Sequence, residues 1–163
     1  MKRIGILSDT HGVWDRRFTE YFKECDEVWH AGDVGDPEII QKLQALVPTV
    51  HAVYGNIDGQ DVRWITESTA VFQCEECKVM MQHITGYPGR WAPGMKLLIN
   101  EIKPDIVVGG HSHILKVVYD KELQLLHLNP GAAGCQGWQS CRTLLRLTID
   151  GSDIRDCEVI EFH

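Results

Sequence analysis

Short apolar runs alternate with amphipathic stretches in the first third of the chain. Residues 3–7, 28–31 and 49–54 are short and mostly apolar, which predicts three buried strands. Residues 15–23 carry Phe18, Tyr21 and Phe22 at helical spacing, and a second helix is predicted to begin at Asp36-Pro37. Because strands and helices alternate here, we expect this part of the sheet to be parallel.

The rest of the chain has more strand-like patterns and tight turns. Hairpins are predicted for residues 69–82 around the turn 74–77, for 115–128 around Asp120-Lys121, and for 143–162 around Asp150-Gly151. Residues 93–102 predict a helix, 105–108 a buried strand and 86–94 a loop rich in Gly and Pro. The whole pattern predicts an α/β fold with two packed sheets flanked by helices, and the length of 163 residues fits a single domain over 1–163.

Charge and hydropathy exclude several function classes. The net charge is −7 and no basic stripe stands out, so we expect no general binding of nucleic acid or of acidic membranes. Anionic substrates are still allowed, because bound metal ions can dominate the local field. No apolar run approaches the roughly 18 residues of a membrane span, and no secretory segment is visible at the start. The expected location is therefore the cytoplasm.

The six cysteines are expected to be reduced thiols. Cys74 and Cys77 have the spacing of half a zinc ribbon. The other half would have to be Cys135 and Cys141, whose spacing does not fit the usual knuckle. A plain turn between two strands is the favoured interpretation of the Cys74–Cys77 segment.

Five short polar motifs each lie at or just past the end of an apolar run. They are Asp9-Thr10-His11, Gly32-Asp33, Gly55-Asn56, His83 and Gly110-His111-Ser112-His113. In open α/β sheets, binding sites gather at the carboxyl ends of the strands. Any one motif alone is more typical of a turn, a cap or a structural histidine. Their joint occurrence indicates a metal-dependent hydrolase, and the mixture of nitrogen and oxygen donors suits Mn²⁺, Fe, Zn²⁺ or Co²⁺.

The spacing of these donors predicts two adjacent metal ions. Residues two apart on extended backbone point the same way, so Asp9 and His11 are expected to reach one ion together. Asp33 is expected to bridge both ions through its two carboxylate oxygens. One ion is assigned Asp9, His11, Asp33 and His113, and the other is assigned Asp33, Asn56, His83 and His111. With two carboxylates, two divalent ions keep a positive surplus, which favours attack on a phosphoester by a bridging hydroxide over acyl transfer.

These motifs resemble those of the calcineurin-like metallophosphoesterase superfamily. The short length, Ser8-Asp9-Thr10-His11-Gly12 and Asn129-Pro130-Gly131 are similar to its small bacterial and archaeal branch. The resemblance implies a four-layer αββα sandwich of two mixed β-sheets, with a dinuclear site at one edge. It also implies a phosphodiesterase active on artificial aryl substrates, with Mn²⁺ favoured and Ni²⁺ as an alternative. The residues expected to take part in catalysis are Asp33, Asn56 and His111.

The chain departs from the pattern of the larger relatives at two positions. Those relatives carry a histidine straight after the Gly-Asn pair, proposed to protonate the leaving group, and this chain has Ile57. Asp58 follows, but it need not reach the same place. Relatives often place Gly or Gly-His after the mid-chain histidine, whereas His83 is followed by Ile84-Thr85-Gly86. Without a general acid, we expect a preference for good leaving groups, or for a substrate that supplies its own acid.

Three loops are expected to surround the site, at residues 57–64, 86–94 and 134–142. They hold three arginines that could contact a phosphate and three tryptophans that could stack on a ring, namely Arg63, Arg90, Arg142, Trp64, Trp91 and Trp138. Plain rim and packing residues are an equally good interpretation. The remaining histidines, His30, His51, His127 and His163, are interpreted as structural or solvent-facing, with His30 as a candidate partner of the metal ligands.

The leading hypothesis is a phosphodiesterase with a small phosphoester as its partner. A phosphomonoesterase or nuclease of the same fold is an alternative, weakened by Ile57 and by the lack of a basic groove. A second alternative is an interaction scaffold similar to a retromer subunit, which would not need the full ligand set. No membrane partner is expected, and a homo-oligomer (dimer or tetramer) stays an open alternative.

Overall fold

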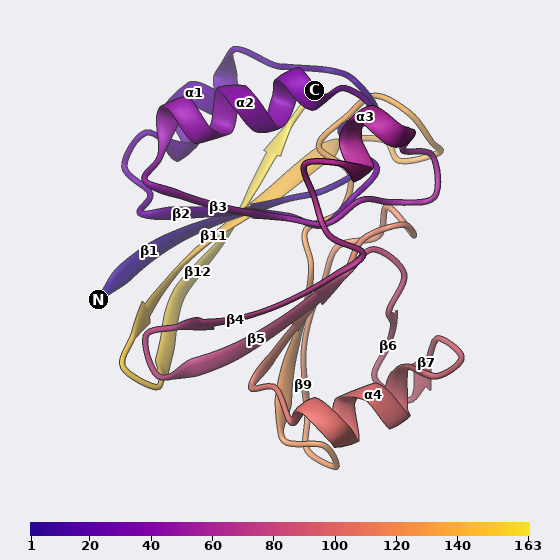
Figure 1. Cartoon of the computed structure of the whole chain (residues 1–163). Helices are drawn as coiled ribbons and strands as arrows, with labels where there is room; N and C mark the ends of the chain where they lie inside the picture. The colour runs from indigo at the N-terminus through magenta and orange to yellow at the C-terminus, as the bar shows by residue number, and fades with distance from the viewer.

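The computed structural model describes all residues from 1 to 163 as two five-stranded sheets with four helices (Figure 1). The first sheet has the order β12-β11-β1-β2-β3 and contains β1 (Lys2–Leu7), β2 (Glu27–His30), β3 (Thr49–Ala52), β11 (Arg142–Asp150) and β12 (Asp153–Phe162). The second has the order β4-β5-β8-β10-β9 and contains β4 (Thr69–Cys74), β5 (Cys77–Gln82), β8 (Ile106–Val108), β9 (Lys116–Asp120) and β10 (Leu125–Asn129). The helices are α1 (Arg17–Phe22), α2 (Pro37–Leu46), α3 (Gln60–Arg63) and α4 (Met95–Ile102).

Both sheets are mixed. Strands β1, β2 and β3 are parallel, as the alternation of strands and helices predicted, and β11 and β12 extend this sheet in antiparallel fashion. In the second sheet β5, β8 and β10 are parallel, while β4 and β9 pair antiparallel at the two edges. The two groups of parallel strands give each sheet one edge at which several carboxyl ends meet.

Three apolar clusters hold four layers together. The largest lies between the sheets and includes Ile6, Trp29 and Met81. A second lies between the first sheet and helices α1 and α2, and a third lies between α4 and the second sheet. The sequence alternates accordingly: Ile4 and Ile6 face the other sheet, while Leu7 faces the helices. The predicted αββα sandwich is therefore confirmed. None of the helices has the length and apolar character needed to cross a membrane.

Several element boundaries differ from the prediction. The first helix begins at Arg17 instead of residue 15, because the Asp15 carboxylate accepts a hydrogen bond from the Arg17 amide just before the helix. The residue before α4 is Gly94, whose φ of 81° is left-handed, so the helix begins after it and not at residue 93. The predicted loop 86–94 contains a small hairpin of β6 (Gly86–Tyr87) and β7 (Arg90–Trp91). Helix α3 was not predicted, since a single turn is too short for an apolar stripe.

Helix α2 depends on its N-terminal cap. The Asp36 carboxylate accepts a hydrogen bond from the Glu38 amide at 2.9 Å, and Pro37 occupies the first turn, as predicted. We expect Asp36→Ala to lower the free energy of unfolding by about 1 kcal/mol, because it leaves that amide without its partner. Urea denaturation measures the difference. Gln44→Ala, on the exposed face of the same helix, is the matched control, and equal losses in both variants would contradict the cap's role.

Candidate metal centre

The predicted donor residues meet where the two sheets adjoin. Asp9 and Asp33 follow β1 and β2 in the first sheet, while His83 and His111 follow β5 and β8 in the second. Backbone hydrogen bonds fix these loops to one another: the Asp9 amide donates to the Gly32 carbonyl, and the Gly110 amide donates to the His83 carbonyl. The His111 amide donates to the Asp9 carboxylate at 3.1 Å and so joins the loops of the two sheets.

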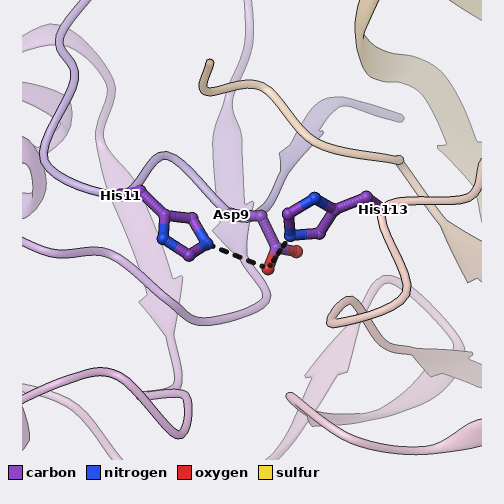
Figure 2. Close-up of side chains that lie close together, drawn as sticks. All are labelled: Asp9, His11 and His113. Carbon is purple, nitrogen blue, oxygen red and sulfur yellow. Dashed lines mark hydrogen bonds and ion pairs between the residues drawn. The ribbon is translucent and has the colours of Figure 1, made fainter. Parts of the chain in front are cut away.

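One group of donors consists of Asp9, His11 and His113 (Figure 2). Asp9 Oδ1 lies 3.1 Å from His113 Nε2 and 3.7 Å from His11 Nε2. Asp9 is fully buried, whereas the two histidines are partly exposed. The three side chains therefore point at a common position from two segments that are far apart in the sequence.

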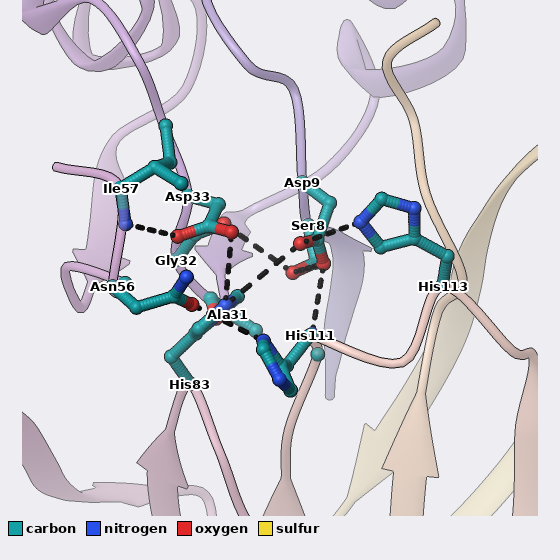
Figure 3. A network of polar contacts seen from close by, with 12 residues as sticks. Ser8, Asp9, Ala31, Gly32, Asp33, Asn56, Ile57, His83, His111 and His113 are labelled. Carbon is teal, nitrogen blue, oxygen red and sulfur yellow. Dashed lines mark hydrogen bonds and ion pairs between the residues drawn. The ribbon is translucent and has the colours of Figure 1, made fainter. Parts of the chain in front are cut away.

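The second group consists of Asp33, His83 and His111, with Asn56 beside it (Figure 3). His83 Nε2 lies 3.2 Å from Asp33 Oδ2. His111 Nδ1 lies 3.1 Å from Asn56 Oδ1. Asp33 and His83 are buried, while Asn56 and His111 are exposed at the mouth of the site. The structure thus gathers six of the seven predicted donors in two groups and places Asn56 beside the second, while their assignment to two ions stays a prediction.

Asp33 lies between the two groups, and only one of its carboxylate oxygens faces both of them. Its Oδ2 is 3.5 Å from His11 Nε2 and 3.2 Å from His83 Nε2. Its Oδ1 accepts a hydrogen bond from the Ile57 amide at 3.1 Å. In this geometry Oδ2 faces both groups, while Oδ1 is bound by the backbone of the next loop, and a bridge through both oxygens stays a prediction.

Two buried imidazole nitrogens show that these residues fit metal ions. Nε2 of His11 and Nε2 of His83 are buried and make no hydrogen bond of good geometry, although carboxylate oxygens of Asp9 and Asp33 lie 3.2–3.8 Å from them. A buried polar atom without a partner costs roughly 1–3 kcal/mol, so such atoms are rare without a reason. Both atoms face carboxylate oxygens, and a divalent cation would accept both kinds of donor. The first ion would be held by Asp9, His11, Asp33 and His113, and the second by Asp33, Asn56, His83 and His111.

Asp9 and Asp33 favour the protonated, positively charged form of His83. Burial disfavours the charged imidazole, but Asp33 and Asp9 outweigh burial and raise the pKa of His83. The same contacts act on Asp33: burial opposes its charge, while His83, the Ile57 amide and His11 lower its pKa. The site therefore holds Asp33 as a carboxylate, the form that binds a cation.

The backbone at the donors is in an unusual conformation. Five of the seven have left-handed φ angles, with Asp9 at 55°, His11 at 46°, Asp33 at 53°, His111 at 70° and His113 at 62°. Such angles are uncommon for residues other than glycine and gather at functional sites. The prediction that residues two apart converge because they lie on extended backbone is thus wrong. Tight turns after the strands, not strand periodicity, bring the paired donors together.

A set of supporting residues orients the donors, and the sequence analysis missed most of it. The Ser8 hydroxyl donates to Asp9 Oδ2 at 2.6 Å, which leaves Oδ1 to face the histidines. His83 Nδ1 donates to the Ala31 carbonyl at 2.8 Å, which directs Nε2 into the site. The signal for Ser8 was its position beside Asp9, since a buried hydroxyl needs a partner.

His30 and Asp58 support the same loops from behind. Burial lowers the pKa of His30 to about 3, so the ring is neutral. Its Nδ1 accepts from the Gly32 amide at 3.1 Å, and its Nε2 donates to the Thr10 hydroxyl at 3.0 Å. The Asp58 carboxylate accepts from the amides of Val34, Gly35 and Gly55. Asp58 therefore holds backbone and is not free to protonate a leaving group.

We expect Ser8→Ala to weaken metal binding by about 10–100-fold, because outer partners of this kind orient the ligating carboxylate. Isothermal titration of metal-stripped protein with Mn²⁺ measures the change. Ser152→Ala, in the exposed turn between β11 and β12, is the matched control. An affinity equal to that of wild type in both variants would show that Asp9 needs no help from Ser8.

Most of the predicted arginines and tryptophans are engaged elsewhere. Arg142 donates to the Asp15 carboxylate at 2.9 Å and to the Ala133 carbonyl at 2.8 Å. Arg63 donates to the Asp58 carbonyl at 2.7 Å, and Trp91 packs edge-on against His127 with 5.4 Å between ring centroids. Arg90 and Trp91 belong to β7, beside α4 and β9. Trp64 is exposed on the turn after α3. Of the six predicted arginines and tryptophans, only Trp138 lines the same cavity as His111 and His113.

The other predicted groups keep structural roles. The partly exposed His51 stacks on Phe72 with 3.6 Å between ring centroids, and Phe72 packs against the core between the two sheets. All six cysteines are free thiols. Cys74 and Cys77 lie opposite each other at the ends of β4 and β5, on either side of the turn, and belong to neither donor group. The plain turn was thus the better interpretation of their spacing.

Comparison with known proteins identifies related sequences over nearly the whole chain. A family model described as the calcineurin-like phosphoesterase superfamily domain matches residues 1–152. A probable metallophosphoesterase of Methanothermobacter thermautotrophicus is 30% identical, over 96% of this chain and 91% of that protein. A phosphodiesterase of Methanocaldococcus jannaschii is 27% identical, over 79% of this chain and 82% of that protein.

Solved structures agree on the fold. A structure described as a novel archaeal phosphodiesterase has a TM-score of 0.75 and 23% identity, and the alignment covers 98% of this chain and 99% of that one. Wild-type Vps29 of Entamoeba histolytica in complex with Zn²⁺ has a TM-score of 0.75 and 18% identity, with 99% of both chains covered. At these identities the likeness concerns the fold alone, which proteins of different function share.

Proposed function

Since this chain belongs to the calcineurin-like phosphoesterase superfamily, we propose that it is a phosphodiesterase that works with two divalent metal ions. The observation that carries the proposal is the pair of donor groups that share Asp33, with buried Nε2 atoms of His11 and His83 left without a hydrogen bond. The relative described as a phosphodiesterase supports the choice of reaction. The donor set mixes imidazole nitrogen with carboxylate and amide oxygen, which suits Mn²⁺, Fe, Zn²⁺ or Co²⁺. The resemblance to the small bacterial and archaeal branch makes Mn²⁺ the favoured ion among them.

The residues divide into a buried floor and an exposed mouth. When bound, two divalent ions would supply an activated water and stabilise charge on the phosphoryl oxygens. The buried carboxylates of Asp9 and Asp33 would hold the ions and offset part of their charge. Asn56 and His111 are exposed and 3.1 Å apart, so they lie where a substrate phosphate would approach. We assign the polar atom of each that does not ligate the metal the further task of orienting the phosphoryl group by a hydrogen bond.

A phosphodiester fits the surroundings better than a phosphomonoester. A phosphomonoester carries a second negative charge, which enzymes commonly meet with arginine. Arg63 and Arg142 are held by protein oxygens, and Arg90 lies with β7 and α4. The net charge of −7 and the absence of lysine and arginine from the lining of the cavity beside His111 and His113 also disfavour long nucleic acids. The proposed substrate is therefore a small phosphodiester.

Hydrolysis of bis(4-nitrophenyl) phosphate by metal-stripped protein tests the proposal. Turnover is expected to be absent without metal and to return when Mn²⁺ is added, with Ni²⁺, Co²⁺, Fe²⁺ and Zn²⁺ as parallel additions. 4-Nitrophenyl phosphate is the matched monoester, and we expect slower turnover of it. Faster turnover of the monoester would replace the phosphodiesterase by a phosphomonoesterase, and folded protein without turnover under any metal would contradict the proposal.

A scaffold role is the second candidate, and the fold shared with Vps29 favours it. A scaffold needs its surface but not the seven donors or the two buried Nε2 atoms without a hydrogen bond. Metal-stimulated turnover separates the two functions, because only the enzyme requires it. The complete donor set places the enzyme first.

A further inference from the structure

A cavity of about 500 Å³ opens directly beside the exposed side of the metal centre. It is lined by the donor residues His111 and His113, by Ser112 and Ile114, and by the segment 137–139. Ile114 is 58% exposed, and the indole of Trp138 is fully exposed at the tip of its loop. Large apolar side chains left in solvent next to a reactive site point to a ligand that covers them.

The loop that carries Trp138 is fastened to the metal centre. His113 Nδ1 donates to Gln139 Oε1 at 3.1 Å, and the side-chain Nε2 of the same Gln139 donates to the Gln136 carbonyl. The ring of His113 therefore presents Nε2 to Asp9 while its other nitrogen holds the loop (Figure 2). Gly137 has a φ of 111° and sits where any side chain would overlap His113. Trp138 is thus placed by two neighbours that both contact a proposed metal ligand.

The cavity offers flat apolar surface and no cation. Its lining includes no lysine, arginine or carboxylate. A second phosphate would find no positive side chain there, and an aliphatic chain would use only the edge of the indole. A planar aromatic ring matches the indole face, because flat rings stack face to face with little loss of conformational freedom.

We propose that this cavity is the subsite for an aromatic ring carried by the phosphodiester substrate, with the ring stacked on Trp138 and bordered by Ile114. The inference rests on the proposed phosphodiesterase function and names its substrate class as phosphodiesters with a ring next to the phosphate. An aryl group and a nucleobase share this chemistry. The position of the cavity beside His111 and His113 puts the ring within one ester link of the metal centre.

Steady-state kinetics of Trp138→Ala with Mn²⁺ test the subsite. Three 4-nitrophenyl phosphodiesters with the same leaving group serve as substrates, with methyl, phenyl or thymidine 5′ as the second ester group. The methyl ester, whose only ring is the leaving group, shows how much of any effect comes from the 4-nitrophenyl ring that all three share. We expect Trp138→Ala to lower kcat/KM by about tenfold on the preferred ring ester, through KM and with little change in kcat. Trp138→Phe should restore most of it. The larger loss among the phenyl and thymidine esters tells whether the ring is aryl or nucleobase.

Trp64→Ala is the matched control, because Trp64 is 82% exposed and lies outside this cavity. It should stay within about twofold of wild type. A Trp138→Ala variant within the same range on all three esters would overturn the subsite. Titration with phenyl methylphosphonate, a monoanion with one ring, measures binding without turnover. Weaker binding to Trp138→Ala supports the subsite even if no hydrolysis occurs, and equal binding overturns it, so failure of the subsite and failure of the enzyme are separate results.

Discussion

Asp33→Asn is expected to abolish metal-dependent turnover, with a loss in kcat of roughly 10³-fold or more. The reason is the position of Asp33 Oδ2, which lies 3.5 Å from His11 Nε2 and 3.2 Å from His83 Nε2. An amide at this position removes the charge that both donor groups share. A correctly placed metal ion stabilises the transition state by several kcal/mol. Loss of one ion therefore lowers kcat by about 10³-fold.

The measurement is kcat on bis(4-nitrophenyl) phosphate with Mn²⁺, together with the number of ions bound per chain by equilibrium dialysis. Asp61→Asn is the matched control. Asp61 lies in α3, shortly after the loop that holds Asn56 and Ile57, and its exposed carboxylate accepts a hydrogen bond from the Val62 amide. It should bind as many ions as wild type. Asp33→Asn with wild-type stoichiometry and turnover would remove Asp33 from the centre.

Ile57→His is expected to raise the hydrolysis of esters with poor leaving groups by up to about 10²-fold. General acid catalysis is typically worth 10²–10⁴-fold, and a new group rarely reaches the full range. The Ile57 amide donates to Asp33 Oδ1 at 3.1 Å, and its side chain is 48% exposed, so a histidine here would begin beside the metal centre and face solvent. Asp58 does not already supply the proton, since its carboxylate is bound to three backbone amides.

The comparison needs two esters that differ in the leaving group. Methyl 4-nitrophenyl phosphate has a good one and should change little, whereas dimethyl phosphate has a poor one and should gain. Ile57→Gln, of similar length but unable to act as an acid near neutral pH, is the matched control. A wild-type enzyme that hydrolyses both esters at equal rates would show that no acid is missing, and the expected gain would vanish with it.

Much of the fold follows from local patterns. The alternation of strands and helices over residues 3–54 specifies a parallel sheet, and the cap at Asp36 specifies where α2 begins. The hairpins were predictable because a two-strand pattern around a turn needs no distant information. The insertion of β11 next to β1 was not, since it pairs Ile4 with Leu147 across nearly the whole sequence. Only the shared apolar core between the sheets decides that pairing.

The site was predictable in its members and not in its geometry. The donor residues stand out because strand-end Asp, Asn and His recur in one order. Their left-handed backbone angles do not follow from the residue types, since Asp9 and His11 adopt them only where other loops hydrogen-bond their backbone. The single-oxygen position of Asp33 likewise depends on the Ile57 amide, which the sequence does not mark as a donor. The hydrogen bond of Arg142 was not predictable either, because its partner Asp15 lies 127 residues away in the sequence.

The central claim is that this chain holds two metal ions with Asp33 between them. Crystals grown with Mn²⁺ and measured at the manganese absorption edge test it most directly. The expected result is two anomalous peaks about 3.5–4 Å apart, one beside Asp9, His11 and His113 and one beside Asn56, His83 and His111, with Asp33 touching both. A single peak, or peaks remote from Asp33, would contradict the claim.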